Sequence, residues 1–360
     1  MKKKVVLLAL AFSFVFMGLP STAGWLSANA LAAEKNNGKV IVYNWSEYIP
    51  QEVLDEFTKE TGVEVVYSTY ETNDSMYAKI KLLRGKGYDL VCPSTYYLHL
   101  MIEEGLFKKF DHSKLSNIVN LDPQLMNPSY DPGNEYSIPY MWGSVGLLIN
   151  TAYVKPENAR SFKDLLRPEY KGKIILTDDM RDCYGMAMHA VGKSANSTDP
   201  DDIKAGYEFL KALHPSVVTF DVSAVKQAFI SEEVIIGTSW NGDALVAQQE
   251  KPELEFVYPE DGALVWVDSF AMPVGAENVE NAHKFVNFLL RPEIAKKCQE
   301  EYMYSTPNLK TLDLLSAEKR ANRTLVPTGD ELKNAEYLLN YGGKTLQIYK
   351  NYWEKARSGL

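Results

Sequence analysis

The chain has 360 residues and a formal net charge of −9, with 47 acidic against 38 basic side chains. This length is enough for two lobes that each bury a core of their own. The excess of acidic side chains argues against nucleic acid and against anionic membrane surfaces as partners. Cys92, Cys183 and Cys298 form no Cys-x-x-Cys pair, which argues against a zinc site and leaves open one disulfide or three buried thiols.

The first residues have the pattern of a secretory signal. Lys2–Lys4 precede an apolar run over Val5–Leu19, and small residues follow as far as Ala33. We expect a signal peptide over residues 1–33, because Pro20–Thr22 interrupt the apolar run before it reaches the length of a membrane anchor. Cleavage removes three lysines and no acid, so the formal charge of the mature chain becomes 35 minus 47, or −12. A freely soluble periplasmic protein is the expected outcome.

Strand and helix patterns alternate in the first part of the chain. The expected elements are a buried strand over Val40–Trp45, a helix over Gln51–Glu60, a strand over Val63–Tyr70, a helix capped by Asn73 that ends near Leu83, and a short strand over Asp89–Cys92. This order predicts parallel strands joined by right-handed crossovers. In open sheets of this kind, ligands bind beyond the carboxyl ends of the strands. Trp45, Ser94, Thr95 and Tyr96 all stand at such ends.

A second unit of the same kind follows an extended segment over residues 136–150. Its expected elements are a strand over Lys173–Thr177, helices over Pro200–Leu213 and Val222–Ile230, a strand over Val234–Trp240, an extended return over Leu254–Tyr258, a strand over Leu264–Pro273, a helix over Val279–Leu290 and a mainly helical tail over Asp330–Ala356. The chain is therefore predicted to be of the α/β class.

Aromatic and acidic residues recur together near three of these strand ends. Trp266 and Asp268 lie two residues apart in a strand and therefore face the same side. An aromatic face beside a carboxylate suits an organic cation, because the ring attracts the cation through its quadrupole and the carboxylate attracts it by charge. The same combination occurs at Trp45-Ser-Glu47 and at Trp240-Asn-Gly-Asp243, which predicts one shared pocket. For Trp266 and Asp268 alone, a core tryptophan beside a turn-capping aspartate is the alternative.

Several motifs together resemble the spermidine/putrescine-binding proteins of bacterial polyamine transporters. They are Tyr43-Asn-Trp-Ser-Glu-Tyr-Ile-Pro50, Asp89-Leu-Val-Cys-Pro-Ser-Thr-Tyr-Tyr97, Tyr136-Ser-Ile-Pro-Tyr140, Leu176-Thr-Asp-Asp179, Trp240-Asn-Gly242, Trp266-Val-Asp268 and Phe288-Leu-Leu-Arg-Pro292. The resemblance implies a two-lobed periplasmic binding protein of type II, in which each lobe is a mixed, mostly parallel sheet flanked by helices and the ligand lies in the cleft between lobes. It further implies an N-terminal lobe of residues 37–144 and 267–313 and a C-terminal lobe of residues 145–266 and 314–360.

The resemblance also implies a function and a set of ligand-binding residues. The protein would not be an enzyme and would need no cofactor or metal; it would capture spermidine or putrescine and deliver it to the inner-membrane permease of an ABC transporter. The aromatic walls would be Trp45, Tyr48, Tyr96, Trp240, Trp266 and Tyr304, the charge partners Asp179, Asp182 and Asp268, and the further oxygen acceptors Ser46, Glu47, Ser94 and Thr95.

Two positions depart from the pattern of that family. Asp182 stands where the family commonly has Glu, and the shorter arm weakens that expected contact or gives it to a water. Leu338 stands where a spermidine-binding relative has Gln, so an amide contact is missing. The preference between spermidine and putrescine is therefore left open.

The same residues allow other interpretations. The fold is shared by receptors for other solutes, such as a sugar, another organic cation or a metal chelate. Two of Glu47, Asp179, Asp182 and Asp268 could act as the acid and base of a glycoside hydrolase. Asp179 and Asp182 stand at the start of a helix and could simply cap it. A polyamine sensor that feeds no permease is a further alternative, and a monomer is expected.

Overall fold

The computed structural model describes residues 38–360, so the predicted signal peptide lies outside the described residues. The strands are β1 (Lys39–Trp45), β2 (Glu64–Tyr70), β3 (Leu90–Val91), β4 (Phe107–Lys108), β5 (Ser137–Asn150), β6 (Ile174–Thr177), β7 (Val217–Asp221), β8 (Ile236–Trp240), β9 (Leu254–Val257), β10 (Leu264–Pro273) and β11 (Glu336–Tyr337). The helices are α1 (Gln51–Thr61), α2 (Asn73–Leu82), α3 (Thr95–Glu103), α4 (Met180–Ala190), α5 (Pro200–Leu213), α6 (Val225–Ile230), α7 (Asn241–Glu250), α8 (Val279–Leu289), α9 (Pro292–Tyr302), α10 (Leu309–Leu312), α11 (Ala317–Ala321) and α12 (Gly343–Arg357).

The strands of residues 38–360 belong to one mixed sheet whose main path has the order β2-β1-β3-β10-β5-β8-β6-β7. Off this path, β4 and β11 pair with β10, and β9 pairs with β5. The prediction of parallel pairing is confirmed on both sides of the sheet, where β1 pairs with β2 and β3, and β6 pairs with β7 and β8. The two middle strands differ, because β10 is antiparallel to both β3 and β5, and β5 is antiparallel to β8. The sheet thus consists of two parallel parts joined through an antiparallel centre.

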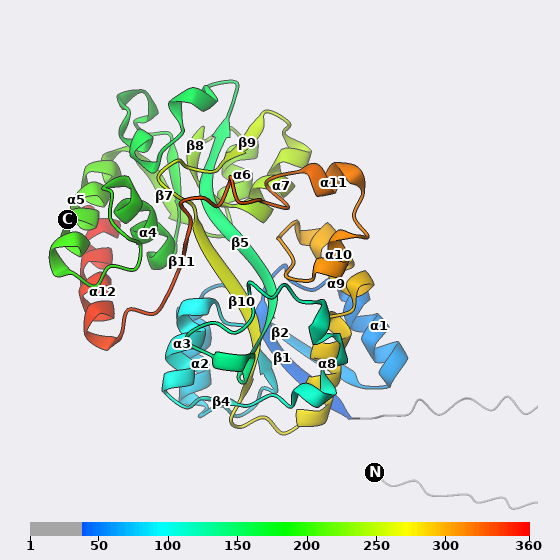
Figure 1. Cartoon of the computed structure of the whole chain (residues 1–360). Helices are drawn as coiled ribbons and strands as arrows, with labels where there is room; N and C mark the ends of the chain where they lie inside the picture. Colours follow the sequence, from blue (N-terminus) through cyan, green and yellow to red (C-terminus); the bar gives the residue numbers. More distant parts are fainter. Residues whose placement is uncertain (1–37) are drawn as a thin grey trace, which may run out of the picture. The chain divides into compact units, whose positions relative to one another are not determined.

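Strands β5 and β10 connect the two parts of the molecule. Figure 1 shows them running side by side from a group of helices that includes α4, α5, α6 and α7 to a second group that includes α1, α2, α3 and α8. Every residue of β10 is buried. Gly143 of β5 lies opposite Trp266 of β10, and a Cβ atom at position 143 would approach the Trp266 ring to 2.5 Å. The close packing of the indole against β5 therefore requires glycine at this position.

Local sequence explains most of the element boundaries near the carboxyl ends of the strands. Helix α1 buries Val53, Leu54 and Phe57 on one face and ends where Gly62 adopts a φ of 68°. Helix α4 begins at Asp179, whose side chain accepts hydrogen bonds from the backbone N–H groups of Arg181 and Asp182. The cap of α4 thereby positions Asp179, which follows β6.

Several details of the predicted elements differ in the structure. Thr72, and not Asn73, caps α2, because the Thr72 hydroxyl accepts the N–H of Ser75. Helix α6 begins at Val225 instead of Val222, and the stretch after Trp240 continues directly as α7, which the sequence pattern did not reveal. The tail is helical only in α12, since β11 precedes it and Gly342 adopts a φ of 78° before the helix starts.

The described residues contain no helix that is both long and apolar enough to cross a bilayer. Cys92, Cys183 and Cys298 are buried free thiols, which corresponds to the second of the two cysteine states considered from the sequence.

Candidate functional site

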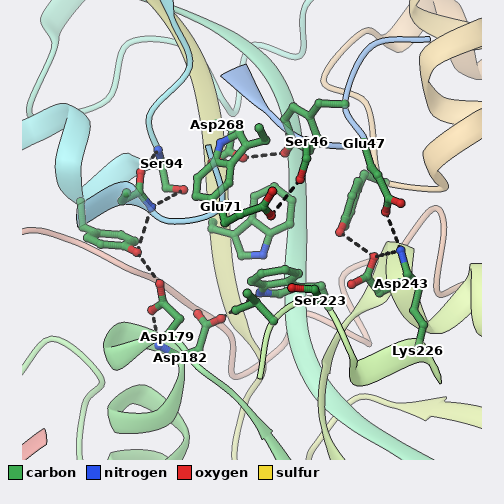
Figure 2. A pocket seen from close by; sticks show the side chains of 18 residues that line it. Ser46, Glu47, Glu71, Ser94, Asp179, Asp182, Ser223, Lys226, Asp243 and Asp268 are labelled. Atoms are coloured by element: carbon green, nitrogen blue, oxygen red, sulfur yellow. Dashed lines mark hydrogen bonds and ion pairs between the residues drawn. The ribbon is translucent and has the colours of Figure 1, made fainter. Parts of the chain in front are cut away.

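A cavity of about 360 Å³ lies where strand ends from the two parts of the sheet meet. Figure 2 shows the 18 side chains that line it. They are Trp45, Ser46, Glu47, Tyr48, Glu71, Asn73, Ser94, Tyr96, Asp179, Asp182, Val222, Ser223, Lys226, Trp240, Asp243, Trp266, Asp268 and Tyr304. The volume corresponds to the lower end of the range for small-molecule sites.

Most of these residues follow directly from strand ends. Residues 45–48 end β1 and lead into α1, Ser94 and Tyr96 follow β3, and Asp179 follows β6. Trp240 ends β8, and Trp266 and Asp268 lie in the middle of the antiparallel pair of β5 and β10. The expected position of a ligand beyond the carboxyl ends of parallel strands is thus where the cavity lies.

Twelve of the thirteen predicted ligand-binding residues line the cavity, and Thr95 does not. The Thr95 hydroxyl donates to the backbone carbonyl of Val267 at 3.0 Å and accepts the N–H of Val267 at 3.1 Å. Thr95 therefore fixes the start of α3 against β10 next to Asp268. Leu338 is fully buried and also lies outside the lining, so a leucine there contributes to the core.

Asp268 is a buried carboxyl group with one satisfied and one unsatisfied oxygen. It is 3% exposed, and its Oδ2 accepts the hydroxyl of Tyr48 at 2.5 Å. Its Oδ1 has no hydrogen-bond partner among the described residues. Burial raises the pKa of Asp268 to about 7, although the nearby hydroxyl groups of Ser94 and Tyr48 oppose this rise. A cationic donor that reached Oδ1 would satisfy the oxygen and favour the ionised form.

Asp179 serves as a helix cap and also faces the cavity. Its Oδ1 accepts the N–H groups of Arg181 at 2.7 Å and Asp182 at 3.1 Å, whereas its Oδ2 accepts the hydroxyl of Tyr96 at 3.0 Å. The capping interpretation is therefore correct for Asp179, and this role does not remove the side chain from the cavity lining. Burial raises the pKa of Asp179.

Within residues 38–360 the Asp182 carboxyl group accepts no capping hydrogen bond, and its partner is an aromatic side chain. The indole N–H of Trp240 donates to Asp182 Oδ2 at 2.8 Å. Burial, and after it the neighbouring charge of Asp179, raise the pKa of Asp182 well above its usual range. Two carboxyl groups so close together both ionise readily only when a cation lies beside them.

Aromatic rings form the walls between the acidic groups. The rings of Trp266 and Tyr304 meet edge to face with centroids 5.4 Å apart, and Tyr48 and Tyr304 lie 5.7 Å apart. Trp266 is 7% exposed, and its indole nitrogen has no hydrogen-bond partner among the described residues. Apolar faces of this kind suit methylene groups, and the same rings attract cations.

Six lining residues were not among the predicted set: Glu71, Asn73, Val222, Ser223, Lys226 and Asp243. Two of them carried a usable signal, because Glu71 directly follows β2 and Asp243 belongs to the Trp240-Asn-Gly-Asp243 motif. Asn73 donates to Ser94 Oγ at 3.1 Å and to Tyr96 Oη at 3.0 Å, which orients both residues. Lys226 had no signal, since a lysine near the start of a helix ordinarily faces solvent.

The lining is strongly acidic. It contains six carboxyl groups, on Glu47, Glu71, Asp179, Asp182, Asp243 and Asp268, and one basic side chain, on Lys226. Within residues 38–360 no three or more His, Cys, Asp or Glu side chains are arranged to hold a metal ion. The lining chemistry therefore suits an organic cation with apolar segments.

Two α/β lobes joined through long central strands, with a cavity at the strand ends of both, define a periplasmic binding protein fold of type II. The family model for the bacterial extracellular solute-binding protein matches residues 52–325. The chain belongs to this family.

Relatives and solved structures agree with that assignment. The chain is 45% identical to the spermidine/putrescine-binding periplasmic protein of Escherichia coli (strain K12) over 93% of this chain and 95% of the relative. It is 39% identical to spermidine/putrescine-binding periplasmic protein 1 of Haemophilus influenzae over 92% of both chains. A putative spermidine/putrescine ABC transporter structure from Listeria monocytogenes superposes with a TM-score of 0.85 at 34% identity, covering 89% of this chain and 98% of that one.

Proposed function

We propose that this protein captures a polyamine, spermidine or putrescine, in the cavity and delivers it to the membrane permease of an ABC transporter. The observation that carries the proposal is the cluster of Asp179, Asp182 and Asp268. These three carboxyl groups line one cavity, and none of them forms an ion pair within residues 38–360.

A polyamine matches this cluster in charge and shape. Its ammonium groups need acceptors, because an ammonium ion removed from water without partners costs several kcal/mol or more. Its methylene groups need apolar walls, which Trp45, Tyr96, Trp240 and Trp266 provide. Each cation–π contact with such a ring contributes about 0.5–2 kcal/mol. The names of the curated relatives, which refer to spermidine and putrescine, support the same ligand class.

Delivery of the polyamine to the permease requires that the bound ligand stabilise a closed arrangement of the two lobes. We assign residues 37–144 and 267–313 to one lobe and residues 145–266 and 314–360 to the other, with a hinge where β5 and β10 pair near Gly143 and Trp266. A ligand that contacts both lobes only when they are closed shifts the population toward the closed state. Transport, a periplasmic location after removal of residues 1–33, and a monomeric state belong to the same proposal. No step in this account is catalytic.

A thermal-shift panel on the mature chain separates the proposed ligand class from the alternatives. Putrescine and spermidine should raise the melting temperature, because a ligand that binds only the folded state stabilises it. Neutral monosaccharides of similar size should leave the melting temperature unchanged. Stabilisation by sugars alone would instead assign a sugar receptor. Hydrolysis of an aryl glycoside that Asp268→Asn abolishes would assign a hydrolase.

A further inference from the structure

Lys226 is the one basic side chain among the described residues that line the cavity. It lies near the start of α6, and its Nζ is 2.6 Å from Glu47 Oε2 and 3.4 Å from Asp243 Oδ1 (Figure 2). Glu47 follows β1 and Asp243 lies in α7. The ammonium group of Lys226 therefore connects residues from the two parts of the sheet across one end of the cavity.

The acceptors around Lys226 resemble those that a free ammonium ligand needs. Asp243 is mostly buried, and its Oδ1 also accepts the hydroxyl of Tyr304 at 3.0 Å. Glu47 adopts a φ of 52°, a conformation that non-glycine residues adopt only when the surroundings hold them there. Two carboxylates thus contact a cation that the protein itself supplies, and the Tyr304 hydroxyl holds one of these carboxylates in place.

Lys226 is held in its charged form. Burial lowers the pKa of Lys226. The charge of Asp243 and the hydrogen bond and charge of Glu47 together raise it by a larger amount, so the pKa lies above its usual value. The side chain is 23% exposed, which shields the pair with Asp243 from most of the solvent. The other carboxyl groups of the lining, on Glu71, Asp179, Asp182 and Asp268, form no ion pair within residues 38–360 and accept only from hydroxyl, indole or backbone groups.

We propose that Lys226 occupies one ammonium position of the cavity and thereby sets the preference of the protein toward a diamine over a triamine. This inference rests on the proposed polyamine function. The two amines of putrescine can use the Asp179, Asp182 and Asp268 end of the cavity and its aromatic walls. A third amine, as in spermidine, that reaches the Lys226 end of the cavity must displace the tethered ammonium or bind there without Glu47 and Asp243. A tethered group competes at a high effective concentration, so displacement weakens triamine binding.

Removal of the lysine charge should therefore convert this position into a third ammonium site. In Lys226→Met, a side chain of similar length keeps the packing while Glu47 and Asp243 become free acceptors. In Lys226→Arg the charge is retained, so the variant should keep the original preference for the diamine over the triamine. Lys251→Ala provides the matched control, because Lys251 pairs with Glu232 at 2.5 Å on the same part of the chain and does not line the cavity.

The test is calorimetric titration of the mature protein and the three variants with putrescine and with spermidine. The ratio of the spermidine Kd to the putrescine Kd should fall at least tenfold in Lys226→Met and stay within threefold of the original in Lys226→Arg and Lys251→Ala. A melting curve of each variant verifies folding.

The possible failures are distinguishable. If the original protein binds neither amine, the proposed function is wrong and the role of Lys226 is wrong with it. If the original protein binds and the ratio in Lys226→Met stays within threefold, only the role of Lys226 is overturned. Should Lys226→Met not fold, the same ratio is measured in Lys226→Gln, with the same two outcomes.

Discussion

The hydroxyl of Tyr48 donates to Asp268 Oδ2 at 2.5 Å and joins the end of β1 to the middle of β10, two segments that are 220 residues apart in the chain. Both side chains are almost fully buried, and both line the cavity. The contact occupies Oδ2 and leaves Oδ1 buried and without a partner among the described residues. The chemistry of Asp268 therefore underlies most of the predictions.

Asp268→Asn should weaken polyamine binding at least tenfold. The replacement keeps the shape of the side chain and an oxygen for the Tyr48 hydroxyl, but it removes the charge that a ligand ammonium needs. Titration of the variant measures the loss. Asp55→Asn serves as a control, because Asp55 is exposed on α1 and outside the cavity. Equal affinities for Asp268→Asn and the original protein would remove Asp268 from the ligand site.

Polyamine affinity should rise with pH across neutrality. In the ligand-free protein, burial raises the pKa of Asp268 to about 7, so the group is largely protonated at pH 6 and largely ionised at pH 8. A cation binds the ionised form, and the affinity should therefore increase about tenfold from pH 6 to pH 8. Binding at pH 6.5 should release protons, which calorimetry in buffers of different ionisation enthalpy detects. An affinity that is constant over this range would contradict the raised pKa.

The ligand-free Asp268→Asn variant should be more stable than the original protein above neutral pH. The pKa of Asp268 is raised from 3.8 to about 7 on folding, so the folded state loses stability as pH rises from about 4 to about 7 and stays at the lower value above that window. Asparagine removes this loss, which amounts to at most about 4 kcal/mol.

Melting curves at pH 5 and pH 8 check this expectation. The gain in melting temperature of Asp268→Asn over the original protein should be larger at pH 8 than at pH 5. A variant that is less stable than the original at both values would mean that the carboxylate stabilises the empty protein.

Thr95→Ala should reduce stability while leaving the affinity nearly unchanged. The hydroxyl makes two hydrogen bonds to the backbone of Val267, each contributing about 1 kcal/mol, and it does not line the cavity. We expect a lower melting temperature and a polyamine Kd within threefold of the original. A specific loss of affinity at unchanged stability would restore Thr95 as a ligand contact.

The sequence predicted the part of the site that depends on strand ends. Trp45 and Trp240 end predicted strands and Asp179 follows another, and the carboxyl ends of parallel strands converge in this class of fold. The Trp266-Val-Asp268 spacing predicted that both side chains face the same side of a strand, and both line the cavity.

The features that could not be predicted from the sequence depend on contacts between segments that are far apart in the chain. Periodicity does not specify that β5 and β10 pair in an antiparallel manner, because a fully buried strand has the same apolar pattern in either direction. Nor does it reveal that Lys226 reaches Glu47, since the two residues are 179 positions apart. Thr95 stands at a strand end and was predicted to bind the ligand, but its hydroxyl bonds to the backbone of Val267 in the neighbouring strand β10.

The most direct test of the account is calorimetric titration of the mature protein with putrescine and with spermidine at about 20 mM and about 200 mM salt. At least one amine should bind, with a weaker affinity at the higher salt concentration, because charged groups recognise the ligand. Failure of both amines to bind at either salt concentration would contradict the account.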